Sequence, residues 1–244
     1  MKVKLIQHTQ NLLDTIYTGA KTCYNAGSPI DMWFDVPTIA RDKKIEFVKK
    51  VITSKHLSVL EHSSFTFAIE GVSRALLAQI TRHRLCSFSV QSQRYVEIKE
   101  DQDYLENLFC GSDEDYKKLL SILNKYFVDG DKLKNVNGYY YALDNYLSAI
   151  KSGEKPEDAR RFLPNGTKTN MVLTCNLREL MHICNERLCT KAQTEIRQMV
   201  QMMVDEVLKD NDWLKDYLTP KCSNGICTER NSCGLYKKYK ENKC

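Results

Sequence analysis

The sequence lacks the closely spaced glycines that many nucleotide-binding proteins use to hold phosphate groups. None of its ten glycines lies two residues from another, so the pattern G-x-G does not occur. This absence excludes the dinucleotide-binding fingerprint and the P-loop, in which glycines allow a tight turn and a close backbone approach. A bound phosphate would have to be held by side chains, chiefly arginine, or by helix N-termini.

Other common signatures are also missing. There is no H-E-x-x-H and no G-x-S-x-G, and the one close pair of histidines, His56 and His62, has no C-x2–4-C pair before it to complete a structural zinc site. No apolar run approaches the roughly 20 residues that a membrane helix needs, and the first residues show no basic start followed by an apolar stretch. We therefore expect a cytoplasmic protein with no membrane partner and no metal.

The overall charge is only mildly positive. Among 244 residues there are 36 basic and 31 acidic side chains, giving a net charge of +5. This balance permits an anionic ligand but does not require nucleic acid, and we expect no nucleic-acid partner. Hydrophobic residues make up 42% of the chain, enough for a substantial core.

Ten cysteines are many for a cytoplasmic chain, and four of them lie in the last 23 residues. Cys222, Cys227, Cys233 and Cys244 are separated by four, five and ten residues. Paired zinc ligands are usually two to four residues apart, so only the first gap fits. The spacing favours an ordinary reduced tail over a metal site.

The hydrophobic periodicity predicts an α+β fold in one domain, with helices packed on a mostly antiparallel sheet. We place this domain at residues 1–220 and a Cys-rich basic tail at residues 221–244. The predicted strands are residues 2–7, 64–70, 94–98 and 168–174. The predicted helices are residues 9–24, 37–53, 73–83, 113–127, 137–151, 176–188 and 190–208.

An arginine- and serine-rich segment is the strongest chemical signal. Arg82, His83 and Arg84 end a predicted helix, and three serines and Arg94 follow within ten residues. Guanidinium groups match phosphate oxygens in bidentate geometry, and hydroxyls satisfy further acceptors. A basic helix end that complements its own dipole would explain one or two of these arginines, but not the hydroxyls and the third.

The predicted helix at residues 176–188 has two distinct faces. Arg178, His182 and Asn185 cluster on one face, opposite an apolar stripe. Arg187 falls at the edge of that stripe, where a partly buried guanidinium needs an anionic or strongly accepting partner. The partner could be a protein carboxylate or a ligand.

Four segments together resemble the flavin-dependent thymidylate synthases. The R-H-R-x7-S signature of that family is matched from Arg82 to Ser92, and His56–His62 resembles its H-x-(S/T)-x-x-E-H segment. Residues 159–164 (ARRFLP) resemble its A-R-x-x-L-P, and residues 176–187 its second signature helix.

The resemblance implies reductive methylation of dUMP to dTMP. The carbon donor would be 5,10-methylenetetrahydrofolate, and NADPH-reduced FAD would supply the hydride. It further implies a homotetramer with shared active sites, and a catalytic Arg187 that favours the ionised uracil ring. The implied dUMP residues are Gln79, Arg82, Gln91, Ser92, Gln93, Arg94, Arg160 and Arg187. The implied FAD residues are His56, Ser58, Glu61, Arg82, His83, Arg84, Asn176, Arg178 and His182.

Two positions depart from the family pattern. Val90 stands where Glu or Gln is frequent, so only its backbone could make a polar contact there. His182 stands where Asn is frequent, and either side chain can donate a hydrogen bond.

Two other functions are compatible with parts of the sequence. The Arg/Ser segment and the basic tail would suit a non-catalytic nucleotide- or RNA-binding module. A methyltransferase with a cysteine nucleophile would need an accessible thiol in a positive environment, a condition for which Cys86, two residues after Arg84, is the candidate.

Overall fold

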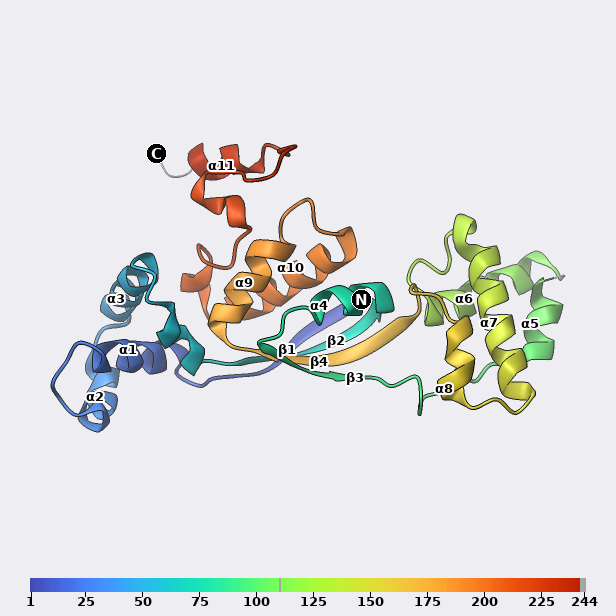
Figure 1. Cartoon of the computed structure of the whole chain (residues 1–244), viewed down its shortest axis with the longest axis horizontal. Helices are drawn as coiled ribbons and strands as arrows, with labels where there is room; N and C mark the ends of the chain where they lie inside the picture. The colour runs from blue at the N-terminus through green and yellow to red at the C-terminus, as the bar shows by residue number, and fades with distance from the viewer. Residues whose placement is uncertain (110, 242–244) are drawn as a thin grey trace. The chain divides into compact units, whose positions relative to one another are not determined.

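The computed structural model describes residues 1–109 and 111–241, so Cys110 and Cys244 lie outside the described residues. Four strands form one antiparallel sheet in the order β1-β2-β4-β3 (Figure 1). The strands are β1 (Lys2–His8), β2 (Phe65–Ser73), β3 (Cys86–Val90) and β4 (Lys168–Cys175). The α+β class and the mostly antiparallel sheet are confirmed.

Eleven α-helices accompany the sheet in the described part of the chain. They are α1 (Leu12–Thr22), α2 (Pro29–Asp35), α3 (Arg41–Thr53), α4 (Arg74–Ile80), α5 (Gln102–Phe109), α6 (Asp113–Tyr126), α7 (Val136–Lys151), α8 (Pro156–Ala159), α9 (Leu177–Arg187), α10 (Thr194–Leu208) and α11 (Leu235–Glu241). Among the described residues, no helix combines the length and the apolar character that crossing a membrane requires.

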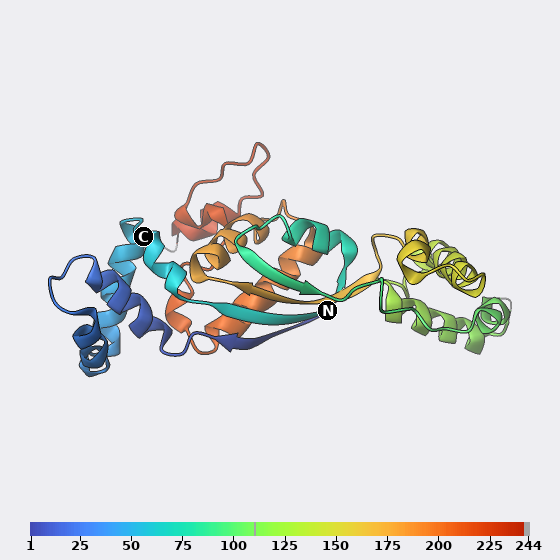
Figure 2. The same ribbon diagram turned by 60° about the horizontal axis from the view of Figure 1, so that its bottom comes forward.

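The two central strands owe their place to strict alternation of buried and exposed side chains. Phe65, Phe67 and Ile69 of β2 are almost fully buried, and their neighbours in the strand are more accessible. In β4, Met171 and Leu173 alternate in the same way. Each strand therefore presents one apolar face, as a sheet covered on one side requires (Figure 2).

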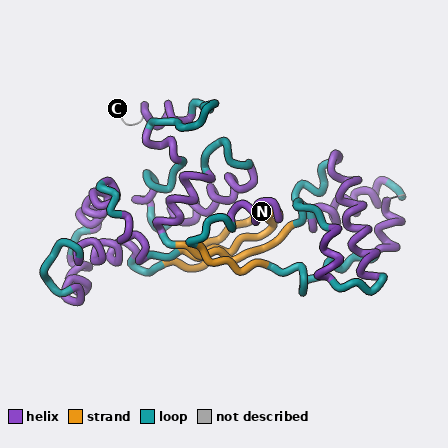
Figure 3. The backbone as a smooth tube through the Cα atoms, in the orientation of Figure 1, coloured by secondary structure: helices purple, strands orange, loops and turns teal. Residues whose placement is uncertain are grey.

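The chain divides into two compact units. The first comprises Met1, Ile69–Ile80 and Ser89–Met171, and the second comprises the remaining residues. In the second unit, α10 packs on β1 and against α9 (Figure 1). In the first unit, α5, α6 and α7 form a group of helices joined by loops (Figure 3). A separate hydrophobic core stabilises that group, with Leu123, Phe127 and Tyr146 near its centre. The domain boundary at residue 220 stays a prediction.

Three details of the predicted secondary structure were wrong. Residues 94–98 form no strand, because the amide of Val96 donates to Ser92 in a turn and that of Ile98 donates to the Tyr146 hydroxyl. Their backbone groups therefore make no strand ladder, and β3 occupies the sheet edge instead. The predicted helix 73–83 ends at Ile80, and the last long helix begins at Thr194 rather than at residue 190. Strand β3 and helices α2, α5, α8 and α11 were not predicted.

Gly130 and Gly138 provide a matched test of the packing of the helical group. A methyl group on Gly130 would lie 2.3 Å from the carbonyl oxygen of Leu123, which is backbone of α6, whereas nothing lies within 4 Å of one on Gly138. Gly130→Ala should lower the free energy of unfolding by about 1–3 kcal/mol through overpacking. Gly138→Ala should raise it by about 0.5–1 kcal/mol through the lower entropy of the unfolded chain.

Denaturant titration followed by circular dichroism measures both changes. Equal effects of the two substitutions would contradict the close approach of residue 130 to α6.

Candidate functional site

Helix α9 carries the most constrained charged groups of the second unit. Its N-cap is Asn176, whose side-chain oxygen accepts the backbone N–H of Glu179 at 2.9 Å. Glu179 lies in the first turn and Arg187 in the last, so each charge faces the favourable end of the helix dipole. The two residues are eight positions apart, about 12 Å along the axis.

The imidazole of His83 joins these two side chains. Its Nδ1 lies 3.1 Å from a carboxylate oxygen of Glu179, and its Nε2 lies 3.0 Å from Nε of Arg187. A guanidinium can only donate, so Nε2 accepts and the ring proton resides on Nδ1, which donates to Glu179. The three groups form one chain of directed hydrogen bonds, from guanidinium to imidazole to carboxylate, and it fixes the orientation of Arg187.

The charge state of His83 agrees with this chain. Burial lowers the pKa of His83, and the nearby positive charge of Arg187 lowers it further, against a smaller raising effect of Glu179. Only 5% of His83 is accessible to solvent. A neutral imidazole is therefore the stable form near pH 7, as the acceptor role of Nε2 requires.

His182 lies beside this chain on the exposed side of α9. Its ring is 5.4 Å from that of His83 in an edge-on arrangement. Ligand atoms of His83, Glu179 and His182 lie within 4.8 Å of one another, a spacing that could hold a metal ion. However, both ring nitrogens of His83 are already engaged, by Glu179 and by the cationic Arg187. The three residues fit a hydrogen-bonded chain better than a metal site.

The structure brings several of the predicted flavin residues together in the second unit. A 3-10 turn at Leu57–His62, which contains Ser58 and Glu61 and follows His56, packs against α9. Glu61 pairs with Arg178 across more than one hundred residues of sequence. The exposed residues of the predicted flavin set are His56, Ser58, Glu61, Arg82, Arg84, Arg178 and His182.

One expectation for the Arg82–Arg84 segment requires correction. Because α4 ends at Ile80, this segment lies beyond the helix, whereas the sequence predicted a helix that continues to residue 83. The contact of His83 with Glu179 is tertiary and overrides the helical pattern at this point. His83, expected to contact FAD, is instead buried between two protein side chains, so a direct flavin contact by its ring stays a prediction.

Arginines gather in the first unit as well. Arg74 donates from Nε and Nη2 to the side-chain oxygen of Gln93, at 3.2 and 2.8 Å. Its pKa is lowered by burial and then by the positive charge of Arg160 nearby. Arg94 donates to Glu157 at 2.8 Å, and Arg160 donates to the Glu157 backbone carbonyl.

The guanidinium groups of Arg94 and Arg160 therefore lie near the carboxylate of Glu157, and Arg74 lies near Arg160. The excess of positive charge is what an anion such as a phosphate would neutralise.

The other predicted residues of the first unit are engaged locally. The side-chain amide of Gln79 donates to the backbone of Ala75, and the side-chain oxygen of Gln91 accepts from Asn170. The hydroxyl of Ser92 accepts the amide of Arg94 and so shapes the loop after β3. Val90, the departure noted in the sequence, is half-buried at the end of β3.

Sequence reasoning missed two residues. Arg74 is half-buried at the first position of α4, directly after a strand. No local pattern at such a junction indicates its hydrogen bonds to Gln93. Glu179 is the buried carboxylate that orients His83. Its position three residues after Asn176 is the carboxylate position of a capping box, which was the available signal.

The buried cysteines near α9 are poorly suited to nucleophilic chemistry. Burial raises the pKa of Cys184 far above that of an ordinary thiol. A hydrogen bond with Cys86, together with burial, raises the pKa of Cys175 well above its usual range. Both thiols stay protonated near pH 7, whereas a nucleophile must be a thiolate.

Comparison with known proteins is consistent along the length of the chain. The sequence model of a family described as "Thymidylate synthase complementing protein" matches residues 4–210. A flavin-dependent thymidylate synthase of Clostridium tetani is 36% identical over 250 residues, covering 96% of this chain and 93% of that protein. A protein of the same name from Nitratidesulfovibrio vulgaris is 37% identical over 248 residues, covering 96% and 95%.

A solved structure has a similar fold. It is the flavin-dependent thymidylate synthase ThyX of Helicobacter pylori complexed with FAD and dUMP. The TM-score is 0.69 at 24% identity, and the match covers 88% of this chain and 97% of that one. At this identity the likeness supports the fold, and the sequence relatives carry the assignment to a family.

The hydrogen-bond chain predicts that two substitutions shift the pKa of His83 in opposite directions. Arg187→Met removes a positive charge and should raise the pKa of His83, whereas Glu179→Gln removes an acceptor charge and should lower it further. In the folded wild-type protein the pKa of His83 lies below 6.5, the ordinary value that the residue has in the unfolded chain. The free energy of unfolding should therefore fall as the pH drops from about 6.5 through the folded pKa.

NMR titration of the histidine ring protons measures these shifts, with the exposed His56 as an internal reference. Shifts of the same sign in both variants would rule out the directed chain.

Proposed function

Because the chain belongs to the flavin-dependent thymidylate synthase family, we propose that it converts dUMP to dTMP by reductive methylation. The carbon comes from 5,10-methylenetetrahydrofolate, and FAD reduced by NADPH supplies the hydride. The observation that carries the proposal is Arg187, which the buried pair His83 and Glu179 holds in one orientation within the signature helix.

The residues around α9 fit a flavin nucleotide. Since no G-x-G loop exists, the cofactor's phosphates need cationic side chains, and Arg82, Arg84 and Arg178 are exposed in the second unit. His56, Ser58, Glu61, Asn176 and His182 supply further polar groups from the packed turn and helix. Bound FAD would supply hydride chemistry, which no amino-acid side chain provides.

Arg187 is suited to activate the uracil ring. Its guanidinium keeps its proton under all ordinary conditions, so it stabilises negative charge on the ring without itself acting as an acid. Charge developed on the ring makes C5 the nucleophile that accepts the carbon unit. The His83 and Glu179 contacts hold the guanidinium in place before substrate arrives, which reduces the reorganisation needed during reaction.

The arginines of the first unit are suited to the phosphate of dUMP. Arg160 and Arg94, predicted from the sequence, lie near Glu157, and Arg74 lies near Arg160 and bonds to Gln93, the residue after Ser92. Gln79, Gln91 and Gln93 supply amide groups for the remaining polar contacts, and Arg82 completes the set.

The oligomer and cell compartment follow from the family assignment. We expect a cytoplasmic homotetramer in which several subunits contribute to each active site. Neither nucleic acid nor a membrane is expected as a partner.

Arg160 and Arg161 offer a matched pair for testing the phosphate site. Both are exposed in the same 3-10 turn, but Arg161 pairs with Glu154 and is not among the residues assigned to dUMP. Arg160→Ala should raise the dissociation constant of dUMP about 10- to 100-fold, as expected for loss of one charge-assisted hydrogen bond. Arg161→Ala should change it little.

Isothermal titration calorimetry with dUMP and with deoxyuridine, which lacks the phosphate, separates the contribution of the phosphate to binding from that of the nucleoside. Equal weakening of dUMP binding by both variants would indicate a general charge effect and not a phosphate contact.

Arg187→Met tests the central catalytic role. Losing a preorganised electrostatic contact typically costs about a hundred- to a thousand-fold in rate, so dTMP formation with FAD, NADPH, methylenetetrahydrofolate and dUMP should fall by that factor. FAD binding and the circular dichroism spectrum should be retained. Arg41→Met is the control, because Arg41 is exposed and forms an ion pair with Asp212 at 2.7 Å.

Near-normal turnover in Arg187→Met would exclude the role of this residue. Failure of the wild-type protein to form dTMP under these conditions would overturn the proposed function itself.

A further inference from the structure

The C-terminal segment has little apolar surface with which to hold itself on the rest of the second unit. After Pro220, Cys222 is the only described apolar side chain in the buried core. Helix α11 is short, and its first residues Leu235 and Tyr236 are only half-buried. Ordering such a segment costs conformational entropy, which burial of so few apolar groups does not offset. Another interaction is needed to hold it.

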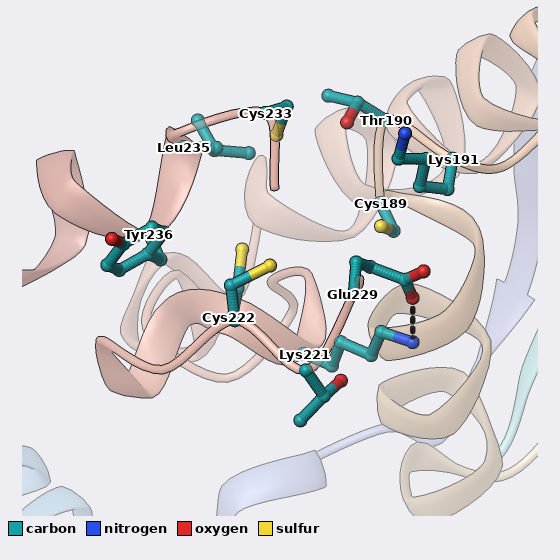
Figure 4. A pocket seen from close by; sticks show the side chains of 11 residues that line it. Cys189, Thr190, Lys191, Lys221, Cys222, Glu229, Cys233, Leu235 and Tyr236 are labelled. Carbon is teal, nitrogen blue, oxygen red and sulfur yellow. Dashed lines mark ion pairs between the residues drawn. The ribbon is translucent and has the colours of Figure 1, made fainter. Parts of the chain in front are cut away.

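Four cysteines surround one small cavity in this region. Cys222, Cys227 and Cys233 come from the C-terminal segment, and Cys189 comes from the residues just after α9. Figure 4 shows the sulfur atoms of Cys189, Cys222 and Cys233 directed toward the same space. All four are free thiols. The fold therefore unites a cysteine more than thirty residues away with the three of the tail, a grouping that the linear spacing had hidden.

Hydrogen-bond donors and cationic side chains surround the cavity. The hydroxyl of Thr190 and the backbone N–H of Leu235 donate to the sulfur of Cys233, and Lys191 lines the same cavity. Lys221, paired with Glu229 at 2.7 Å, also lines the cavity (Figure 4). Metal–thiolate sites typically have such hydrogen-bond donors, which bond to the ligand sulfurs and do not bind the metal themselves.

Four free thiols line the cavity. A metal ion would hold them as thiolates, because its positive charge stabilises the thiolates that it binds. Four converging thiols next to hydrogen-bond donors are thus an arrangement that a metal would complete.

We propose that Cys189, Cys222, Cys227 and Cys233 ligate a thiophilic metal centre that anchors the C-terminal segment to the end of α9. This replaces the expectation, drawn from the sequence, of an ordinary reduced tail. The centre is separate from the Glu179–His83–Arg187 chain and has a structural role, since metal ligation can supply the folding free energy that a small core lacks.

The distances between the sulfurs favour an iron–sulfur cluster over a single zinc ion. With Zn–S bonds of about 2.3 Å, zinc holds its sulfurs no more than about 4.6 Å apart. Among the described residues, no three of these four sulfurs lie within 4.8 Å of one another. A cluster places several iron and sulfide atoms between its four cysteine ligands and so accommodates a wider arrangement.

Metal analysis of the full-length protein tests the proposal. The protein should be purified without oxygen from cells supplied with iron and zinc. Iron, zinc and acid-labile sulfide are then measured chemically, because flavin absorbance would hide that of a cluster. We expect iron and acid-labile sulfide in equal amounts, about two of each per chain for a [2Fe–2S] centre or about four of each for a [4Fe–4S] centre, both of which four cysteines hold. Zinc in place of iron and sulfide would retain the four-thiolate site and overturn the cluster.

Cysteine variants locate the site. Cys227→Ser and Cys233→Ser should lose most of the metal. Removing a residue that only bonds to a ligand typically weakens metal binding 10- to 100-fold, and removing a ligand itself should weaken it more. Cys23→Ser should keep it, because Cys23 is exposed at the end of α1. Trypsin should remove the C-terminal segment faster from the two metal-deficient variants, and circular dichroism should show that the remainder stays folded.

The proposal fails if the wild-type protein contains no stoichiometric metal and takes none up during anaerobic incubation with iron and sulfide or with zinc. It also fails if Cys227→Ser and Cys233→Ser retain the wild-type metal content.

Discussion

A single chain of hydrogen bonds, from Arg187 through His83 to Glu179, fixes the polar side chains of helix α9 in the second unit. It works because one short helix supplies both ends: the carboxylate in its first turn and the guanidinium in its last. The helix dipole stabilises both charges, and the buried imidazole between them is neutral. A protonated imidazole could not accept from Arg187, so its depressed pKa is a condition for the orientation of the guanidinium.

The same arrangement answers the question that the sequence left open about Arg187. Its partly buried position required either a protein acceptor or a ligand, and the structure supplies an acceptor that is itself neutral. An imidazole nitrogen satisfies one guanidinium donor without cancelling the positive charge of Arg187.

Much of the fold was predictable, for identifiable reasons. Phe65–Ile69 and Met171–Leu173 alternate strictly, and the apolar stripe of α9 has a clear helical period, so local pattern and burial agree. Residues 94–98 alternate as well, but no neighbouring strand pairs with them. The role of Glu179 was hidden because its partner is 96 residues away, and the link from Arg74 to Gln93 joins a helix start to a loop. Such contacts depend on topology, which local periodicity does not encode.

The cysteines show how position in the fold, more than residue type, decides chemical behaviour. Cys175 and Cys184 lie beside the same helix that carries Arg187, yet burial and hydrogen bonding keep their thiols protonated and hence inert. Cys233 has hydrogen-bond donors and Lys191 beside it, which favour its thiolate.

The proposed methylation chemistry uses arginine and flavin and needs no reactive thiol near the substrate. The cysteines can therefore be apolar core residues near α9 and, as proposed, metal ligands at Cys189 and in the C-terminal segment. Three of the four proposed ligands lie beyond residue 210, where the match to the family model ends, and Cys189 lies within it, two residues after Arg187.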